Sequence, residues 1–322
     1  MKHIMNICLF YTDLERYQNR KDLYTYYKKF GLDGLEVLDA RDQDVNKIVV
    51  PEDVIGVHLR YFPCWYCLWS GDTKSMMEEF GSWEEVKAQF GGTDREAILQ
   101  AFRQNLEFAR SFHPQYVVFH VADVLLSEAV SRKFRYSDEE IVDAAAEILN
   151  ELLVQDEGFE LLLENLWWPG LTMTRPEITY RLLENVRYPR KGIMLDVGHL
   201  MHTNTGICTQ EEGVAYIREV LGRYEDRSII RGVHFHQTLS GAYVEEQKLH
   251  PPILRGTYYD KTGTLAEYVY RVDSHKPFLC SGARELIDWI NPEYLVYELM
   301  TGSREEHEQA MWELSKQNID YK

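Results

Sequence analysis

Histidine and acidic side chains close short apolar segments along the whole chain, and both residue types bind divalent metal ions readily. The residues are Glu36, His58, His120, Glu164, Asp196, His199, His236 and Glu298. A single histidine after an apolar run usually packs and hydrogen-bonds. Repetition changes this interpretation, because an uncompensated charge at the end of each buried strand would cost several kcal/mol. The pattern therefore predicts a site for a divalent cation.

These residues must be positioned by short β-branched runs that alternate with amphipathic helical stretches. We expect strands at residues 3–10, 34–38, 54–59, 116–120, 160–164, 192–196, 229–236 and 294–298. Helices are expected between them, including residues 95–110, 138–154, 210–224 and 281–290, with a last one at 303–315. Strands separated by helices pair in parallel through right-handed crossovers, and eight of them can close a (β/α)8 TIM barrel. The strand ends of such an α/β barrel converge on one mouth.

Two connections after strands, residues 60–94 and 237–271, are much longer than a barrel requires. Loops that follow strands lie on the C-terminal face, where barrel enzymes build their active sites. We therefore expect both insertions to be long loops over a substrate, not separate domains. With no linker or low-complexity tract in the sequence, we predict a single domain over residues 1–322.

The composition excludes several classes of protein. No stretch approaches the roughly 18 apolar residues of a membrane span, and residues 1–11 look like a strand, not a signal peptide, so a soluble cytoplasmic protein is expected. Five cysteines argue against a disulfide framework, and Cys64 and Cys67 have redox spacing without a thioredoxin-like context. A nucleotide-binding P-loop, a dinucleotide fingerprint and a serine nucleophile elbow are all missing. The net charge of −17 disfavours nucleic acid as a partner.

The sequence resembles the xylose-isomerase-like barrel superfamily, which holds sugar isomerases and epimerases and also the type IV apurinic endonucleases. The motifs that carry the resemblance are Gly34-Leu35-Glu36, Leu163-Glu164-Asn165, Leu195-Asp196-Val197-Gly198-His199, Val233-His234-Phe235-His236 and Tyr297-Glu298. The resemblance implies that a divalent ion (Mn, Mg, Co or Zn) is held by Glu164, Asp196, His236 and Glu298, with His199 beside it. We expect His234 to face away from the pore and to pack.

Two branches of the superfamily remain open at this point. The endonuclease branch holds three zinc ions, and here His58, His120 and the Asp273-Ser274-His275 segment match its additional ligands. These residues are therefore candidates for further metal ligands or for substrate contacts. The long connection between His236 and Asp273, and the lack of a basic cluster on the strand-end loops, favour the sugar branch.

The resulting prediction is a metal-dependent isomerase or epimerase of a small sugar, sugar phosphate or keto-polyol, acting through an enediolate. The alternatives are a zinc-dependent apurinic endonuclease-like phosphodiesterase and a barrel that binds metal and carbohydrate without turnover. We expect Glu164 and Glu298 to move the proton and His199 to hold a substrate hydroxyl. Some epimerases of this superfamily carry another glutamate shortly after the ligand on the fifth strand. No such glutamate follows Glu164 here, which weakens the epimerase assignment. The sequence leaves a homo-oligomer open.

Aromatic residues near the expected mouth could stack on the C–H faces of a sugar. We assign this role to Tyr61, Trp65, Trp167 and Trp168. The Ser281-Gly282-Ala283 helix start is a weak indication of a phosphorylated substrate, because helix N-termini bind phosphate.

Overall fold

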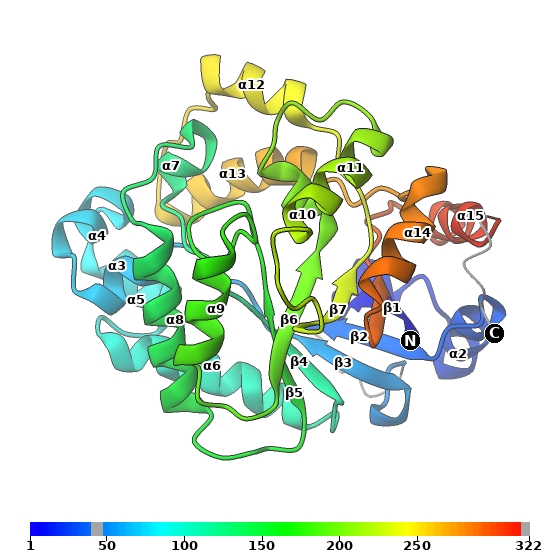
Figure 1. Cartoon of the computed structure of the whole chain (residues 1–322). Coiled ribbons are helices and arrows are strands. Elements are labelled where there is room, and N and C mark those ends of the chain that lie inside the picture. The colour runs from blue at the N-terminus through cyan, green and yellow to red at the C-terminus, as the bar shows by residue number, and fades with distance from the viewer. Residues whose placement is uncertain (40–47, 317–322) are drawn as a thin grey trace.

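Eight parallel strands close a barrel in which each strand pairs with its neighbours in sequence and β1 pairs with β8 (Figure 1). This computed structural model describes residues 1–39 and 48–316. The strands are β1 (Lys2–Cys8), β2 (Gly34–Leu38), β3 (Val54–His58), β4 (Tyr116–His120), β5 (Glu160–Glu164), β6 (Lys191–Asp196), β7 (Ile230–His234) and β8 (Tyr294–Tyr297). The predicted (β/α)8 fold is confirmed.

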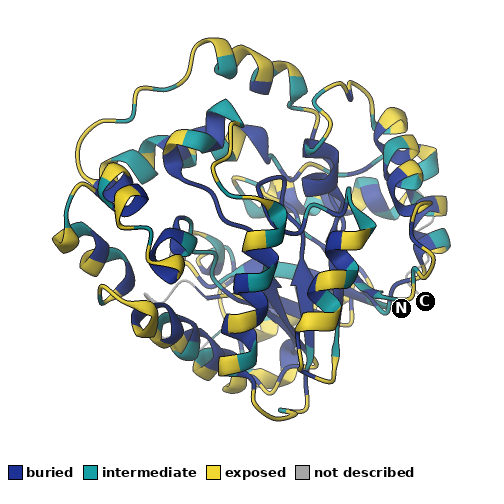
Figure 2. Ribbon diagram, turned by 60° about the vertical axis from the view of Figure 1, so that its left-hand side comes forward, coloured by how far each residue is buried: buried dark blue, intermediate teal, exposed yellow. Residues whose placement is uncertain are grey.

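The helices surround the barrel, and their apolar faces pack on the strands (Figure 2). The outer helices are α2 (Arg20–Lys29), α6 (Arg95–Arg110), α8 (Asp138–Leu152), α9 (Pro176–Asn185), α11 (Gln210–Leu221), α14 (Ser281–Ile290) and α15 (Arg304–Ser315). The shorter helices α1 (Tyr11–Leu14), α7 (Leu126–Ser131) and α10 (Val197–His202) directly follow strands β1, β4 and β6. None of the described helices is long and apolar enough to cross a membrane.

The two long connections contain helices that the sequence analysis did not predict. Residues 60–94 form α3 (Trp65–Ser70), α4 (Thr73–Phe80) and α5 (Trp83–Phe90), while residues 237–271 hold α12 (Gly241–Leu249) and most of α13 (Tyr258–Val272). Local signals explain them: Asp72 and Ser82 cap the starts of α4 and α5, and Gly81 and Gly91 end them with φ of 81°. Figure 1 shows α12 and α13 beyond the ends toward which the strands point.

The inside of the barrel is filled by a layer of large apolar side chains. Its members are Ile4, Ile55, Tyr116, Val118, Leu162, Met194, Tyr294 and Val296. Gly56 makes room for this layer, because a Cβ at that position would lie 2.1 Å from the Tyr116 ring. Since side chains alternate along a strand, the residue two positions after an inward-facing one also faces inward, now at the mouth. Val118, Leu162 and Met194 thus place His120, Glu164 and Asp196 above the core.

Candidate metal centre

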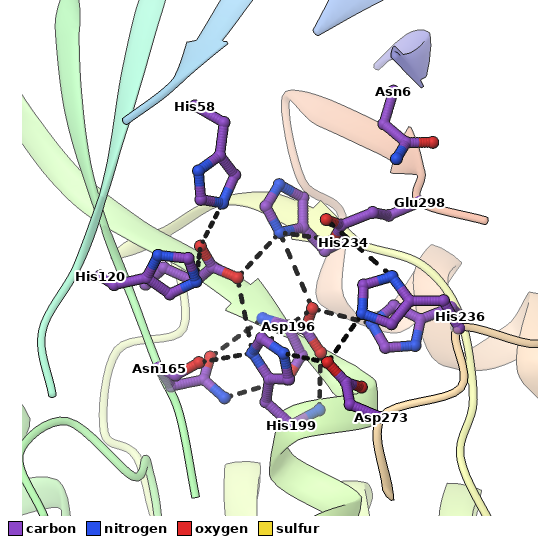
Figure 3. Close-up of polar contacts among 12 residues, drawn as sticks. Asn6, His58, His120, Asn165, Asp196, His199, His234, His236, Asp273 and Glu298 are labelled. Carbon is purple, nitrogen blue, oxygen red and sulfur yellow. Dashed lines mark hydrogen bonds and ion pairs between the residues drawn. The ribbon is translucent and has the colours of Figure 1, made fainter. Parts of the chain in front are cut away.

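Histidine and carboxylate side chains from several strands meet at the mouth of the barrel (Figure 3). They fall into overlapping groups in which one ligand atom from each residue lies within 4.8 Å of the others. The groups are His58, His120 and Glu164; Glu164, Asp196, His234 and Glu298; His199, His236, Asp273 and His275; and the overlapping combination His58, His234 and Glu298. Most of these side chains are buried, so water solvates their charges poorly.

Glu164 belongs to two of these groups and uses a different oxygen for each. Its Oε2 lies 2.8 Å from Nε2 of His58 and 3.2 Å from Nε2 of His120. Its Oε1 lies 3.0 Å from Nδ1 of His234. A carboxylate placed in this way could bridge two cations, one on each side.

His234 points into the barrel and joins Glu164, Asp196 and Glu298. Its Nδ1 lies 3.1 Å from Oε2 of Glu298 and 3.8 Å from Oδ2 of Asp196. The prediction that His234 faces away from the pore is therefore wrong. His234 is the last residue of β7 and lies two positions after Gly232, where a Cβ would lie 2.6 Å from Sδ of the inward-facing Met194. The period of two along a strand places both residues on the inner face.

His236 lies beyond the end of β7, so the structure groups it differently from the sequence prediction. Its Nε2 is 2.8 Å from Oδ2 of Asp196, and its ring stacks on that of His275 at 3.9 Å. The candidate ligand group around Glu298 contains His234 in its place.

Asp273 joins the histidines of the remaining group. Its Oδ2 lies 2.8 Å from Nε2 of His275 and 3.1 Å from Nε2 of His199. Asp273 directly follows α13, so the inserted helix is covalently linked to this part of the site.

Hydrogen bonds from surrounding groups fix the orientation of the histidine rings. The Nδ1 atoms of His58 and His199 lie 2.9 Å from the carbonyl oxygens of Leu59 and Asn165, to which each would donate as N–H. This leaves Nε2 of each ring facing the carboxylates. Such contacts to the other ring nitrogen are usual for histidines that bind metal.

Glu36 orients His234 in the same manner. The Glu36 carboxylate accepts a hydrogen bond of 2.7 Å from the Tyr116 hydroxyl and lies 3.1 Å from Nε2 of His234. Glu36 is one of the strand-end candidates for which the sequence predicts no individual role. Its position below His234 follows from the strand register, which one sequence does not specify.

The protonation of the isolated chain indicates how strongly this site attracts positive charge. Burial alone would lower the pKa of His58, His199 and His275, but the neighbouring carboxylates outweigh it and raise these pKa values to about 9, 10 and 9. Burial lowers the pKa of His120 to about 3, so this ring is neutral. Protons therefore compensate the buried carboxylates where metal ions would otherwise do so.

The donor set fits a divalent ion. Imidazole nitrogens and carboxylate oxygens lie close together, and the buried Oδ1 of Asp273 has no hydrogen-bond partner within the described part of the chain. Groups this rich in histidine favour Zn, Co or Mn over Mg, which prefers all-oxygen ligands.

A cavity of about 480 Å³ lies over these groups. Glu36, His58, His120, His199, Asp273, His275 and Glu298 line its polar part. Tyr61, Trp167 and Trp168, expected to stack on a substrate, also line it. Trp65 does not; its buried indole N–H donates to the carbonyl of Ala122 over 2.9 Å, and we no longer expect it to touch a substrate. The Ser281-Gly282-Ala283 segment likewise lies outside the cavity lining.

Comparisons with known proteins agree with this architecture. The model of the family described as xylose isomerase-like TIM barrel matches residues 88–278. No curated protein matches the sequence significantly.

Several solved structures share the fold. A D-tagatose 3-epimerase-like protein has a TM-score of 0.52 at 15% identity, covering 98% of this chain and 97% of that one. The IolI protein with a bound zinc atom has a TM-score of 0.53 at 15% identity, covering 100% and 98%. Endonuclease IV from Thermus thermophilus has a TM-score of 0.53 at 12% identity, covering 98% of each chain. An epimerase-like protein, a protein with a bound zinc atom and an endonuclease thus share this barrel fold.

Proposed function

Because the chain belongs to the xylose isomerase-like TIM barrel family, we propose that it is a metal-dependent isomerase or epimerase of a small carbohydrate-type substrate. The observation that carries this proposal is the cavity lined by Glu298, which belongs to the candidate ligand group of Glu164, Asp196, His234 and Glu298. A divalent ion held by that group would act as a Lewis acid toward two adjacent substrate oxygens.

Glu298 is the best placed base. Its side chain lines the cavity and is 15% exposed, and its Oε2 lies 3.1 Å from Nδ1 of His234. It can reach a proton on the carbon next to a substrate carbonyl. Glu164 is fully buried below the cavity, and His58 and His234 engage both of its oxygens. We therefore assign Glu164 a ligand role and no longer expect it to move the proton.

His199 faces the same cavity and could hold a substrate hydroxyl. Its Nδ1 is committed to the Asn165 carbonyl, which leaves Nε2 as the atom directed toward Asp273 and the cavity. This arrangement would fix the substrate relative to Glu298. Correct placement of the reacting carbon is a large part of catalysis by proton transfer.

The proposal is tested by exchange of a substrate carbon-bound proton with solvent deuterium in the metal-loaded enzyme. Exchange with a ketose or a keto-sugar should be lost in Glu298→Gln and retained in Glu184→Gln, a matched change on the exposed surface of α9. Metal content is measured in both variants. Exchange that persists in Glu298→Gln with its metal bound would remove Glu298 as the base.

A second candidate function is metal-assisted phosphodiester hydrolysis. The adjoining ligand groups favour it, because two or more ions that share a bridging carboxylate are typical of phosphoryl transfer. A duplex substrate fits less well, since α13 lines the cavity and the described residues that line it include no lysine or arginine. Zinc-dependent cleavage of an abasic duplex, abolished in Asp273→Ala, would reverse the order of the two candidates.

A further inference from the structure

We propose that the substrate is amphiphilic: an oxygen-rich head binds at the metal groups, and an uncharged apolar tail lies between α13 and the β4 and β5 loops. This inference rests on the proposed metal-dependent function and adds a substrate class to it. It follows from an uneven distribution of side chains around one cavity.

The cavity has two chemically different parts. Among the described lining residues, every carboxylate and imidazole group belongs to the metal groups or to Glu36 beside them. Most of the other described lining residues are apolar, and they include Leu126, Leu166, Trp167, Trp168, Leu265 and Val269. A free sugar bound at the metal groups could stack on Trp167 and Trp168, but it would leave Leu265 and Val269 without a complementary apolar surface.

Helix α13 supplies one wall of the apolar part. Leu265, Ala266 and Val269 line the cavity at spacings of one, three and four residues, which place them on one helical face. Tyr270 also lines it, although 62% of its surface is exposed, so it stands at the rim. Because α13 leads directly into Asp273, this wall and the metal groups are fixed relative to each other.

A second wall comes from the segments after β4 and β5. Val124 and Leu126 are buried and line the cavity, and Trp167 and Trp168 lie beside them in the lining. The Trp168 ring stacks on Tyr61 with centroids 5.9 Å apart. These side chains are held by their own packing, so the wall exists before a ligand binds.

Both cationic side chains of α13 are engaged elsewhere. Nζ of Lys261 donates to the carbonyl of Glu79 over 2.9 Å, and the Arg271 guanidinium lies over the Tyr243 ring. Neither residue is among those lining the cavity. A phosphate or carboxylate at the far end of a substrate would therefore be desolvated without a partner, which is unfavourable. The tail is uncharged, and a terminally phosphorylated sugar is not the substrate we infer.

A cavity of this size suits such a molecule. About 480 Å³ falls within the range of small-molecule sites, which are typically apolar with a few polar groups that fix orientation. An aryl or alkyl group attached to a polyol or keto head would contact both parts.

Hydroxamates test this inference, because they chelate divalent ions through two oxygens and carry a tail of choice. Acetohydroxamate, benzohydroxamate and 4-carboxybenzohydroxamate are titrated calorimetrically into the zinc-loaded protein of residues 1–322. The first two chelate zinc with similar strength in water, so the ratio of their affinities reports the cavity. We expect benzohydroxamate to bind about tenfold tighter or more, and the carboxylated analogue to lose this gain.

The variant Val269→Asp should abolish the preference for benzohydroxamate over acetohydroxamate. Thr264→Asp, on the same helix but outside the cavity lining, is the matched control and should keep the preference. The ratio in the unmodified protein decides the matter even if Val269→Asp does not fold. Equal binding of acetohydroxamate and benzohydroxamate, or tightest binding of the carboxylated analogue, overturns the inference and leaves the metal centre standing. If no hydroxamate binds, the proposed metal centre is contradicted, and so is this inference, which rests on it.

Discussion

The carboxylate of Glu36 lies 3.1 Å from Nε2 of His234, while Nδ1 of the same ring lies 3.0 Å from Glu164. One ring nitrogen is thus committed to Glu36, and the other is presented to the candidate metal group. The tautomer and the ring orientation of His234 are set by a residue on a distant strand.

We predict that Glu36→Gln lowers metal affinity about 10- to 100-fold, because loss of such a supporting carboxylate typically has this effect. Competition with a chromogenic chelator measures it. Glu184→Gln is the matched control and should bind metal as the unmodified protein does. Unchanged affinity in Glu36→Gln would show that His234 needs no support.

Removing metal should make stability depend on pH in the alkaline range. In the metal-free chain the pKa values of His58, His199 and His275 are raised to about 9, 10 and 9 from 6.5. A raised histidine pKa contributes stability that is fully present below pH 6.5 and is lost as the pH rises through the folded value. The melting temperature of protein from which a chelator has removed the metal should therefore decrease as the pH rises from about 6.5 to about 10.

The metal-loaded protein should show a smaller decline over the same range, because bound metal keeps these rings deprotonated. Differential scanning calorimetry of both forms makes the comparison. Parallel curves for the two forms would contradict the assignment of these histidines as ligands.

Asp123 should impose a second pH dependence. It is buried and accepts a hydrogen bond of 2.9 Å from the backbone N–H of Trp65, and burial raises its pKa from 3.8 to about 8. A raised carboxyl pKa contributes stability that is present at low pH and is lost as the pH rises toward 8. The free energy of unfolding of Asp123→Asn, relative to that of the unmodified protein, should therefore be higher at pH 8 than at pH 5.

Urea denaturation of metal-loaded protein at these two pH values measures the difference. Asp226→Asn, in the exposed turn before β7, is the control and should show no such trend. An equal effect of Asp123→Asn at both pH values would mean that Asp123 is ionised throughout.

Two glycine substitutions should change stability in opposite directions. A Cβ at Gly56 would lie 2.1 Å from the Tyr116 ring, whereas a Cβ at Gly263, within α13, meets nothing within 4 Å. We expect Gly56→Ala to lower the free energy of unfolding by about 1 to 3 kcal/mol through overpacking. Gly263→Ala should raise it by about 0.5 to 1 kcal/mol through helix propensity. Chemical denaturation measures both changes. An unchanged free energy of unfolding in Gly56→Ala would mean that the barrel core rearranges easily to accept the added methyl group.

The spacing of apolar residues, with a period of two in strands and of about 3.6 in helices, was sufficient to predict most of the barrel. Strands β2, β4 and β5 and helices α6 and α14 have the bounds expected from the sequence. The other strands differ slightly at their ends, where local hydrogen bonding decides. The inserted helices were missed because long connections were treated as loops, although the cap at Thr257 and the glycines after α4 and α5 were visible in the sequence.

The site was predicted less completely than the fold. Residue types at strand ends identified most of the candidate ligands. The alternation of side chains along β7 could also have given the correct orientation of His234. The sharing of Glu164 between two groups depends on register and side-chain rotamers, which the sequence of one chain does not reveal. The apolar wall from α13 depends on how an insertion folds back over the mouth.

The most direct test of the central claim is the number of divalent ions bound per chain after zinc loading and dialysis, measured by inductively coupled plasma mass spectrometry. We predict between one and three ions per chain, corresponding to the ligand groups at the mouth, and fewer in His234→Asn. His250→Asn, at an exposed position after α12, should leave the number unchanged. Unmodified protein without bound zinc, or the same number in His234→Asn, would contradict the account.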